Sequence, residues 1–305
     1  MFKYLSPRFI KRSPHLIAVL QALFVTFLWS TSWVLIKFGL ADIPAITFAG
    51  LRYTVAFFCL LPFIFTRSSL TTLGRLTKSD WLRLVLLGVL FYTITQGAQF
   101  LALAYLPAIT ATLLLNFTTI VVALMGIVLL TERPNLFQWA GVGLNFAGIF
   151  IYFYPVDLPA NQIIGIVVAI VGVLANAGSS ILGRYINRTG TISPLQVTTV
   201  SMGIGAILLL AVGSVTQGLP NLSLTHWAII GWLAIVNTAF AFTLWNVTLK
   251  VLSAMESSII NSTMLIQIAI LAWIFLGERV TWQEGLGMLL AGLGVLMVQL
   301  RRQHK

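Results

Sequence analysis

The sequence predicts an all-α membrane protein in which ten transmembrane helices form two inverted five-helix repeats. Only 8% of the 305 residues are charged and 59% are hydrophobic, whereas about a quarter of the residues of a soluble protein are charged. The mean hydropathy is +0.98, so the chain lacks the polar residues to cover a water-facing surface. The apolar residues form runs of spanning length, and one stretch of sequence occurs twice.

Ten apolar runs are long enough to cross a membrane. A helix needs about 20 apolar residues to cross a hydrocarbon layer of about 30 Å, and backbone groups in lipid must pair within their own segment, which favours helices. The connections are short, and no phosphate-binding loop of the form G-x-x-x-x-G-K-[ST] is present, so the sequence carries no recognisable ATPase. The expected spans are 16–39, 46–66, 82–104, 108–130, 136–154, 162–184, 195–216, 227–249, 254–277 and 282–300.

The first span follows the basic segment MFKYLSPRFIKRSPH and runs from Leu16 to Leu40. A cleaved signal peptide would have a shorter apolar core followed by a small-residue cleavage site. This run is of spanning length and contains Trp29 and Trp33. We therefore expect it to be retained as a membrane helix.

Residues typical of helix ends bound the other spans of the first half. Pro44 precedes the second span, and Trp81 lies just before the third, where it suits the membrane interface. The fourth span ends at the pair Glu132-Arg133, and the fifth span follows that pair.

The second half is bounded in a similar way. Gly172 lies in the sixth span, where a small residue permits close helix packing. Pro194 precedes the seventh span, and Trp227 and Trp282 begin the eighth and the tenth. The ninth span starts two residues before Glu256.

A shift of 146 residues brings LTERPNLFQWAGVGLNFAG (130–148) onto LGERVTWQEGLGMLLAGLG (276–294). Such internal similarity indicates duplication. Each half holds five spans, an odd number, so the second half must enter the membrane the other way up, as in secondary transporters with inverted repeats. The expected units are a tail (1–15), a first repeat (16–154), a second repeat (162–300) and a second tail (301–305).

The net charge of +11 is explained by membrane topology and not by nucleic-acid binding, because the basic residues lie in short segments between apolar runs. With the N-terminus inside, fifteen Lys and Arg residues lie on the inner side. Only Lys37, Arg52 and Arg279 lie outside. This bias predicts that both termini are cytoplasmic and that the inner segments lie beside anionic lipid.

The chain resembles the EamA family of the drug/metabolite transporter superfamily over nearly its whole length. The resemblance lies in the ten-span layout, the doubled L-x-E-R boundary with spaced glycines, W-S-x-S-W from Trp29 to Trp33, and P-x-x-x-x-x-x-x-R from Pro44 to Arg52. It implies transport of small metabolites, commonly efflux of amino acids or drugs. The chain departs from the pattern at Thr119 and Leu265, where many members have proline. We therefore expect no kink in the fourth and ninth spans.

Three acidic residues allow two interpretations each. Glu132 and Glu278 are either gate residues or helix starts whose carboxylates offset the helix dipole while the neighbouring Arg pairs with them. Their recurrence on opposite sides favours helix starts. Glu256 has Thr110 as its repeat counterpart, so symmetry does not require it. Intramembrane carboxylates are often functional, and Glu256 either relays protons or pairs with Lys250.

Two basic residues flank the outer loop that contains Asp42. Lys37 and Arg52 either attract a substrate carboxylate or extend to the membrane interface, which is the default for long basic side chains near helix ends. We predict a coupling or gating role for Lys37, Arg52 and Glu256.

Neutral polar and aromatic side chains lie deeper in the spans. Amides in lipid need partners and should face the bundle interior, where they either join helices or line a substrate path. Aromatic rings with a few amides suit an amphipathic or aromatic substrate. The predicted substrate-binding residues are Trp29, Trp33, Tyr92, Gln96, Gln99, Asn116, Asn176, Asn237 and Asn261.

Several functions are disfavoured. Because Cys59 is the single cysteine, an intrachain disulfide is excluded. The three histidines lie at span edges or in a tail, so we expect no bound metal, no cofactor and no enzymatic activity. The spans hold no central Lys or Arg for a phosphate, and inverted repeats favour alternating access over an ion channel.

We therefore expect a secondary transporter, working as an exporter, that moves small neutral or zwitterionic metabolites such as amino acids across the cytoplasmic membrane by alternating access. Its expected partners are a small-molecule substrate and the lipid bilayer, with no nucleic acid; oligomeric state is not predicted. The alternatives are a permease for drugs or other organic metabolites and, from another class, a membrane-embedded enzyme.

Overall fold

The computed structural model describes residues 14–130, 135–155, 159–189, 192–248, 251–252 and 260–299. Every regular element in these ranges is helical. Seven helices within them are long and apolar enough to cross a membrane, and three shorter apolar helices cover Ala108–Val122, Ile260–Leu276 and Trp282–Val298. The chain is thus an all-helical, multi-pass membrane protein.

Local polar side chains cap three helices of the first half. Thr77 and Asp80 form a capping box at the start of α4, and Asn135 and Gln138 form one at α8. The elements are α1 (Pro14–Gly39), α2 (Ala45–Ile64), α3 (Arg67–Gly74), α4 (Lys78–Leu87), the π-helical segment η1 (Gly88–Thr95), α5 (Gln96–Tyr105), α6 (Ala108–Leu115), α7 (Thr118–Leu130) and α8 (Leu136–Phe153).

The described elements of the second half follow the order of the first, except that α3 and α6 have no counterpart among them. Shifted by 146 residues, the bounds of α7 and α8 coincide with those of α14 and α15, and η1 overlaps η2. The elements are α9 (Ala160–Thr189), α10 (Pro194–Thr216), α11 (Leu224–Ala234), the π-helical segment η2 (Ile235–Phe240), α12 (Ala241–Thr248), α14 (Met264–Leu276) and α15 (Trp282–Gln299).

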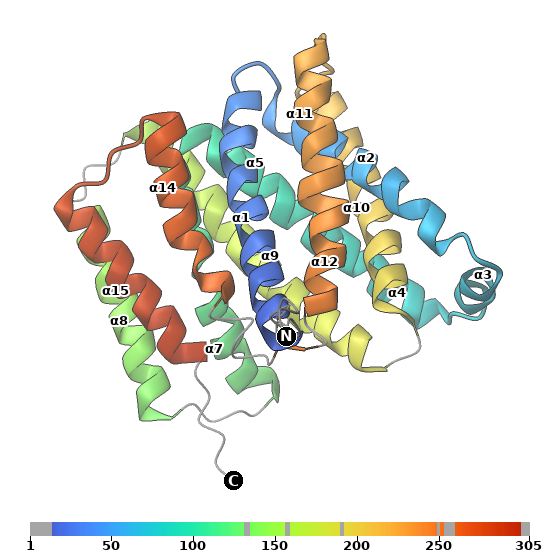
Figure 1. The fold of residues 1–305 in the computed structure, drawn as a ribbon, viewed down its shortest axis with the longest axis horizontal. Helices are drawn as coiled ribbons and strands as arrows, with labels where there is room; N and C mark the ends of the chain where they lie inside the picture. The colour runs from blue at the N-terminus through green and yellow to red at the C-terminus, as the bar shows by residue number, and fades with distance from the viewer. Residues whose placement is uncertain are drawn as a thin grey trace, which may run out of the picture.

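Helices α8 and α15 pack with their backbones in contact, and they lie side by side at one edge of the molecule (Figure 1). Gly141 lies against Gly294, and Gly148 lies against Gly287. The order is reversed along the two chains, so the helices run antiparallel. Because small residues let helix backbones approach closely in membranes, the repeated glycines form the contact between these two equivalent helices.

Helices α2 and α10, the second helix of each half, also pack antiparallel. Gly213 of α10 lies against the backbone of Thr47, and Gly50 of α2 lies against the backbone of Leu210. At the end of this contact Gln217 Oε1 accepts a hydrogen bond of 2.8 Å from the amide of Ile46. Two pairs of equivalent helices therefore meet in opposite directions.

The expectation of unkinked fourth and ninth spans is wrong. A turn at Asn116 and Phe117 separates α6 from α7, and Thr263 interrupts the helical run 260–276. The side chains of Asn116 and Thr263 bond to carbonyls of the preceding turn, at Thr112 (2.9 Å) and Ile260 (2.6 Å). Polar side chains that bind their own backbone compete with the helical ladder, so the break forms without proline.

The main core is formed by helices of both halves, chiefly α1, α2, α5, α6, α10, α11 and α14. Phe48 and Phe100 are fully buried there and stack edge to face with ring centroids 5.2 Å apart. The outer faces of the helices carry large exposed apolar side chains such as Phe63 and Trp273. Such a surface suits lipid, since the helices can bury polar groups only toward one another.

Candidate functional site

Two π-helical segments lie at equivalent positions in the two halves. In η1 the hydroxyl of Thr95 donates a hydrogen bond to the carbonyl of Leu90, and in η2 the hydroxyl of Thr238 donates one to the carbonyl of Leu233. Each bond is 2.8 Å long and joins residues that are five positions apart. This spacing is that of a π-helix, a form that is frequent at functional sites. The segments bring Tyr92, in η1, and Thr238 into the buried centre of the bundle.

Arg52 of α2 is buried beside η2, with 4% of its surface exposed. Its Nε donates a hydrogen bond of 3.2 Å to Thr238 Oγ1. The guanidinium lies 5.2 Å from the ring centroid of Tyr53 and 5.9 Å from that of Phe100. Among the described residues no carboxylate lies within ion-pair distance of Arg52. Extension to the membrane interface therefore does not occur, and the cation is held inside the protein.

Tyr53 joins two of the predicted substrate-binding residues beside Arg52. Its hydroxyl donates a hydrogen bond of 2.7 Å to Gln96 Oε1, and its ring meets that of Tyr92 edge to face at 5.7 Å. All three side chains are buried. The structure thus places a cation, a hydroxyl, an amide and aromatic rings together near the α2–η1 contact.

A second polar and aromatic group lies where α1 meets η2 and α12. Asn237 Nδ2 donates hydrogen bonds to the carbonyl of Leu28 and to Thr31 Oγ1. Trp29 packs against Phe242 and Trp245, with ring centroids 5.3 and 5.2 Å away. Asn237 Oδ1 and Trp29 Nε1 are buried and have no partner in the described part of the chain. Both halves therefore contribute to this group.

The other predicted substrate-binding residues lie apart from these groups. Trp33 is buried in the main core, and Gln99 is half-buried. Asn116 bonds within its own span, as described above. Asn176 Nδ2 donates to Thr118 Oγ1 at 3.4 Å, and the side chain of Asn261 is exposed. Glu256, the predicted proton relay, and the pair Glu132-Arg133 lie outside the described residues, so these three remain predictions from sequence.

Gln267 of α14 forms a network that the predicted site did not include. Its Nε2 donates to Thr26 Oγ1 (3.2 Å) and to Thr263 Oγ1 (3.0 Å), and its Oε1 accepts from Ser30 (3.0 Å). The network joins α1 of the first half to α14 of the second. An amide at mid-span was the signal available in the sequence.

Replacing Gln267 with leucine should lower the free energy of unfolding by about 1–2 kcal/mol, because hydrogen bonds between membrane helices contribute about 0.6 and at most about 1.7 kcal/mol each. Thermal unfolding in detergent would measure the loss. Gln99→Leu is the matched control, since no described residue hydrogen-bonds that amide, and it should change stability less. Equal losses in the two variants would contradict the structural importance of the network.

Lys37 binds the end of α5. Its Nζ donates hydrogen bonds of 2.7 Å to the carbonyls of both Leu103 and Leu106. The ammonium therefore points inward, and the default of extension to the interface fails for this residue as it does for Arg52. The sequence signal was Pro107, which separates α5 from α6 and leaves carbonyls without helical partners.

Glu278 lies at a helix start, but not at the start of its own helix. Its carboxylate accepts hydrogen bonds of 2.6 and 3.0 Å from the amides of Ala108 and Ile109, the first residues of α6. Helix α15 is capped instead by Thr281 and Glu284, whose side chains bond to each other's backbone amides. Glu278 therefore binds the amino end of a helix, but that helix is α6 of the first half and not the helix that follows Glu278 in the sequence.

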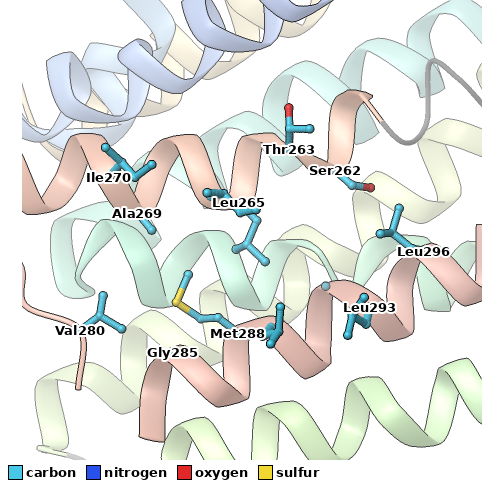
Figure 2. A pocket seen from close by; sticks show the side chains of 13 residues that line it. Ser262, Thr263, Leu265, Ala269, Ile270, Val280, Gly285, Met288, Leu293 and Leu296 are labelled. Carbon is cyan, nitrogen blue, oxygen red and sulfur yellow. The ribbon is translucent and has the colours of Figure 1, made fainter. Parts of the chain in front are cut away.

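A groove between α14 and α15 has a volume of about 420 Å³ (Figure 2). Leu265 and Ala269 of α14 and Met288 of α15 line it and point into the space between the helices. The lining is apolar apart from Ser262 and Thr263, and it includes none of the predicted site residues. The groove therefore suits acyl chains, and we do not assign it to the substrate.

In the described ranges, no group of three His, Cys, Asp or Glu side chains is placed to hold a metal ion. The buried Arg52 binds a hydroxyl and aromatic rings, and the half-buried Lys37 and Glu278 bind backbone groups. Such an arrangement can recognise a polar molecule or hold a conformation.

Comparison with known proteins gives one family. A model of the EamA-like transporter family matches residues 16–154 and 163–300. An uncharacterized transporter of Archaeoglobus fulgidus is 27% identical over 304 residues, which cover 95% of this chain and 98% of that protein. The uncharacterized inner membrane transporter YedA of Escherichia coli strain K12 is 24% identical over 235 residues, 75% of this chain and 74% of that protein. A crystal structure of a protein with 18% sequence identity aligns with a TM-score of 0.66 over 92% of this chain and 97% of that one, a similarity of fold.

Proposed function

The chain belongs to the EamA-like transporter family, and from this premise we propose that it is a secondary transporter that exports small zwitterionic metabolites, such as amino acids, across the cytoplasmic membrane by alternating access. The two relatives described above are named as uncharacterized transporters. The family and these relatives therefore support transport of small molecules by a multi-pass membrane protein. The class of substrate, the direction of transport and the transport mechanism are what we propose here.

Alternating access is supported by how equivalent helices meet. In the proposed architecture, ten spans form two inverted units, 16–154 and 162–300. The antiparallel contacts of α8 with α15 and of α2 with α10 are those expected between inverted halves. Interfaces of this kind let one half rock against the other around a central site. The charge bias toward one side supports cytoplasmic termini.

Arg52 is the observation that carries the choice of substrate. A buried cation without a charged partner is unfavourable, and the described residues offer Arg52 only a hydroxyl and two rings. A guanidinium has five donors and binds carboxylates through paired hydrogen bonds. A substrate carboxylate would supply the missing charge, while Tyr92 and the rings around Trp29 suit an apolar side chain.

A permease for drugs or other organic metabolites is the alternative within the family. Cationic drugs are disfavoured because Arg52 is buried in the bundle and Lys37 lies half-buried at its end, and both would repel them. Neutral aromatic compounds fit the rings around Trp29 but leave Arg52 without a counter-charge.

The test is flux in liposomes that contain the purified protein, with a panel of radiolabelled amino acids and their decarboxylated amines. We expect saturable flux of at least one amino acid, stimulated by the same compound on the opposite side, and weaker flux of its amine. Flux without saturation would indicate a channel, and chemical conversion of the compound would indicate an enzyme. No flux of any amino acid by folded protein would contradict the proposal.

A further inference from the structure

Two charged side chains hold the break between α5 and α6 from opposite sides. Helix α5 ends at Tyr105 and α6 begins at Ala108. Lys37 binds two carbonyls at the end of α5, and Glu278 binds two amides at the start of α6, with all four distances between 2.6 and 3.0 Å. We call this set of contacts the Lys37–Glu278 clamp.

Each charge of the clamp has the sign that its helix end requires. The carboxyl end of a helix carries partial negative charge and unpaired carbonyls, and the amino end carries partial positive charge and unpaired amides. Hydrogen bonds to charged groups are stronger than neutral ones. Lys37 and Glu278 are not within 4.0 Å of each other, so the peptide break lies between them in place of an ion pair.

The clamp joins the two halves of the chain. Lys37, on α1, and the α5–α6 break belong to the first half, whereas Glu278 lies in the turn between α14 and α15 of the second. Gly277 ends α14 in the left-handed conformation, with φ of 68° and ψ of 14°. This turn directs the chain so that Glu278 meets α6. Because Thr281 and Glu284 cap α15, Glu278 is not needed by its own helix.

We propose that the Lys37–Glu278 clamp is the gate at this end of the bundle, and that the end opens only when Glu278 releases the amides of α6. The proposal rests on alternating access, in which contacts between the halves at one end must break as the other end closes. Lys37 and Glu278 then act as positioning residues that set the balance between the two states. The distribution of Lys and Arg assigns this end to the outside.

The test measures how fast a buried thiol is labelled from each face of sealed vesicles. Cys59 is the single cysteine, so Cys59→Ala gives a thiol-free background. Leu113→Cys places the reporter on α6, where the native side chain is 1% exposed. In the proposal, Lys37→Met and Glu278→Gln each raise labelling by a membrane-impermeant maleimide about tenfold from one face only, as expected for the loss of charged hydrogen bonds.

Two further variants make the test specific. Glu284→Gln removes a neighbouring carboxylate that caps only α15 and should leave the labelling rate unchanged. Gly277→Ala keeps both charges but strains the left-handed turn, and it should raise labelling in the same direction as Glu278→Gln. The Gly277→Ala variant keeps the proposal testable if Lys37→Met or Glu278→Gln fails to fold.

Exchanging the two charges separates the clamp from an ion pair. In Lys37→Glu combined with Glu278→Lys, a carboxylate would face the carbonyls of α5 and an ammonium the amides of α6, so labelling should stay fast. Rescue by the exchange, unchanged labelling in the single variants, or faster labelling from both faces would each overturn the proposal. No substrate is needed, so the result stands whatever the flux assay gives.

Discussion

Gly148→Ala is expected to reduce the free energy of unfolding by about 3 kcal/mol, the upper end of the range for overpacked interiors. A Cβ at this position would lie 2.4 Å from the amide nitrogen of Ala291 and 2.6 Å from the carbonyl oxygen of Gly287. These are backbone atoms of α15, so no side-chain rotation can relieve the contact. The helices α8 and α15 would have to separate along their length.

Gly143→Ala is the matched control for that variant. Gly143 lies in the same helix, one and a half turns away, and a Cβ there meets no atom within 4 Å. Alanine favours a helix over glycine by about 1 kcal/mol, so this variant should be neutral or more stable. Thermal unfolding of both proteins in one detergent gives the comparison. A similar change in the two variants would contradict the backbone contact between α8 and α15.

Arg52→Gln is expected to lower the transport efficiency for a carboxylate substrate about 100-fold. A hydrogen bond to a charged group contributes about 1.5–3 kcal/mol, and each 1.4 kcal/mol is about a tenfold change. Arg52→Lys keeps the charge but loses the paired donors, so its loss should be intermediate. Initial rates of uptake in liposomes, measured against substrate concentration, give the ratio.

The decarboxylated amine of the same substrate shows whether Arg52 acts on the substrate or on the fold. If the guanidinium binds the carboxylate, Arg52→Gln should remove most of the preference for the acid over the amine. Arg279→Gln replaces an exposed arginine and should leave that preference intact. An equal loss of flux for acid and amine in Arg52→Gln would mean that Arg52 only supports the contact between α2 and η2.

The two π-helical segments show where prediction from the helical periodicity of the sequence fails. The sequence predicted Tyr92 and Gln96, four residues apart, as substrate-binding residues, and both contact Tyr53. They do so across the end of η1, where the spacing is no longer α-helical. Apolar residues fill both kinds of helix, so composition cannot distinguish them. The structure identifies both segments as π-helical, and in each a threonine hydroxyl bonds to the carbonyl five residues back.

The sequence by itself predicted an all-helical membrane protein, and it showed that one stretch of the chain occurs twice. Apolar length, helix caps and glycine spacing are properties of short segments, so the doubled stretch at 130–148 and 276–294 could be recognised without a structure. The contact between α8 and α15 was found only in the structure. The partners of the charges were decided only by tertiary structure. Lys37 meets carbonyls 66 and 69 residues away, and Glu278 meets amides about 170 residues away. Contacts between residues so far apart in the sequence depend on how all the helices pack. The local sequence around each residue does not specify that packing.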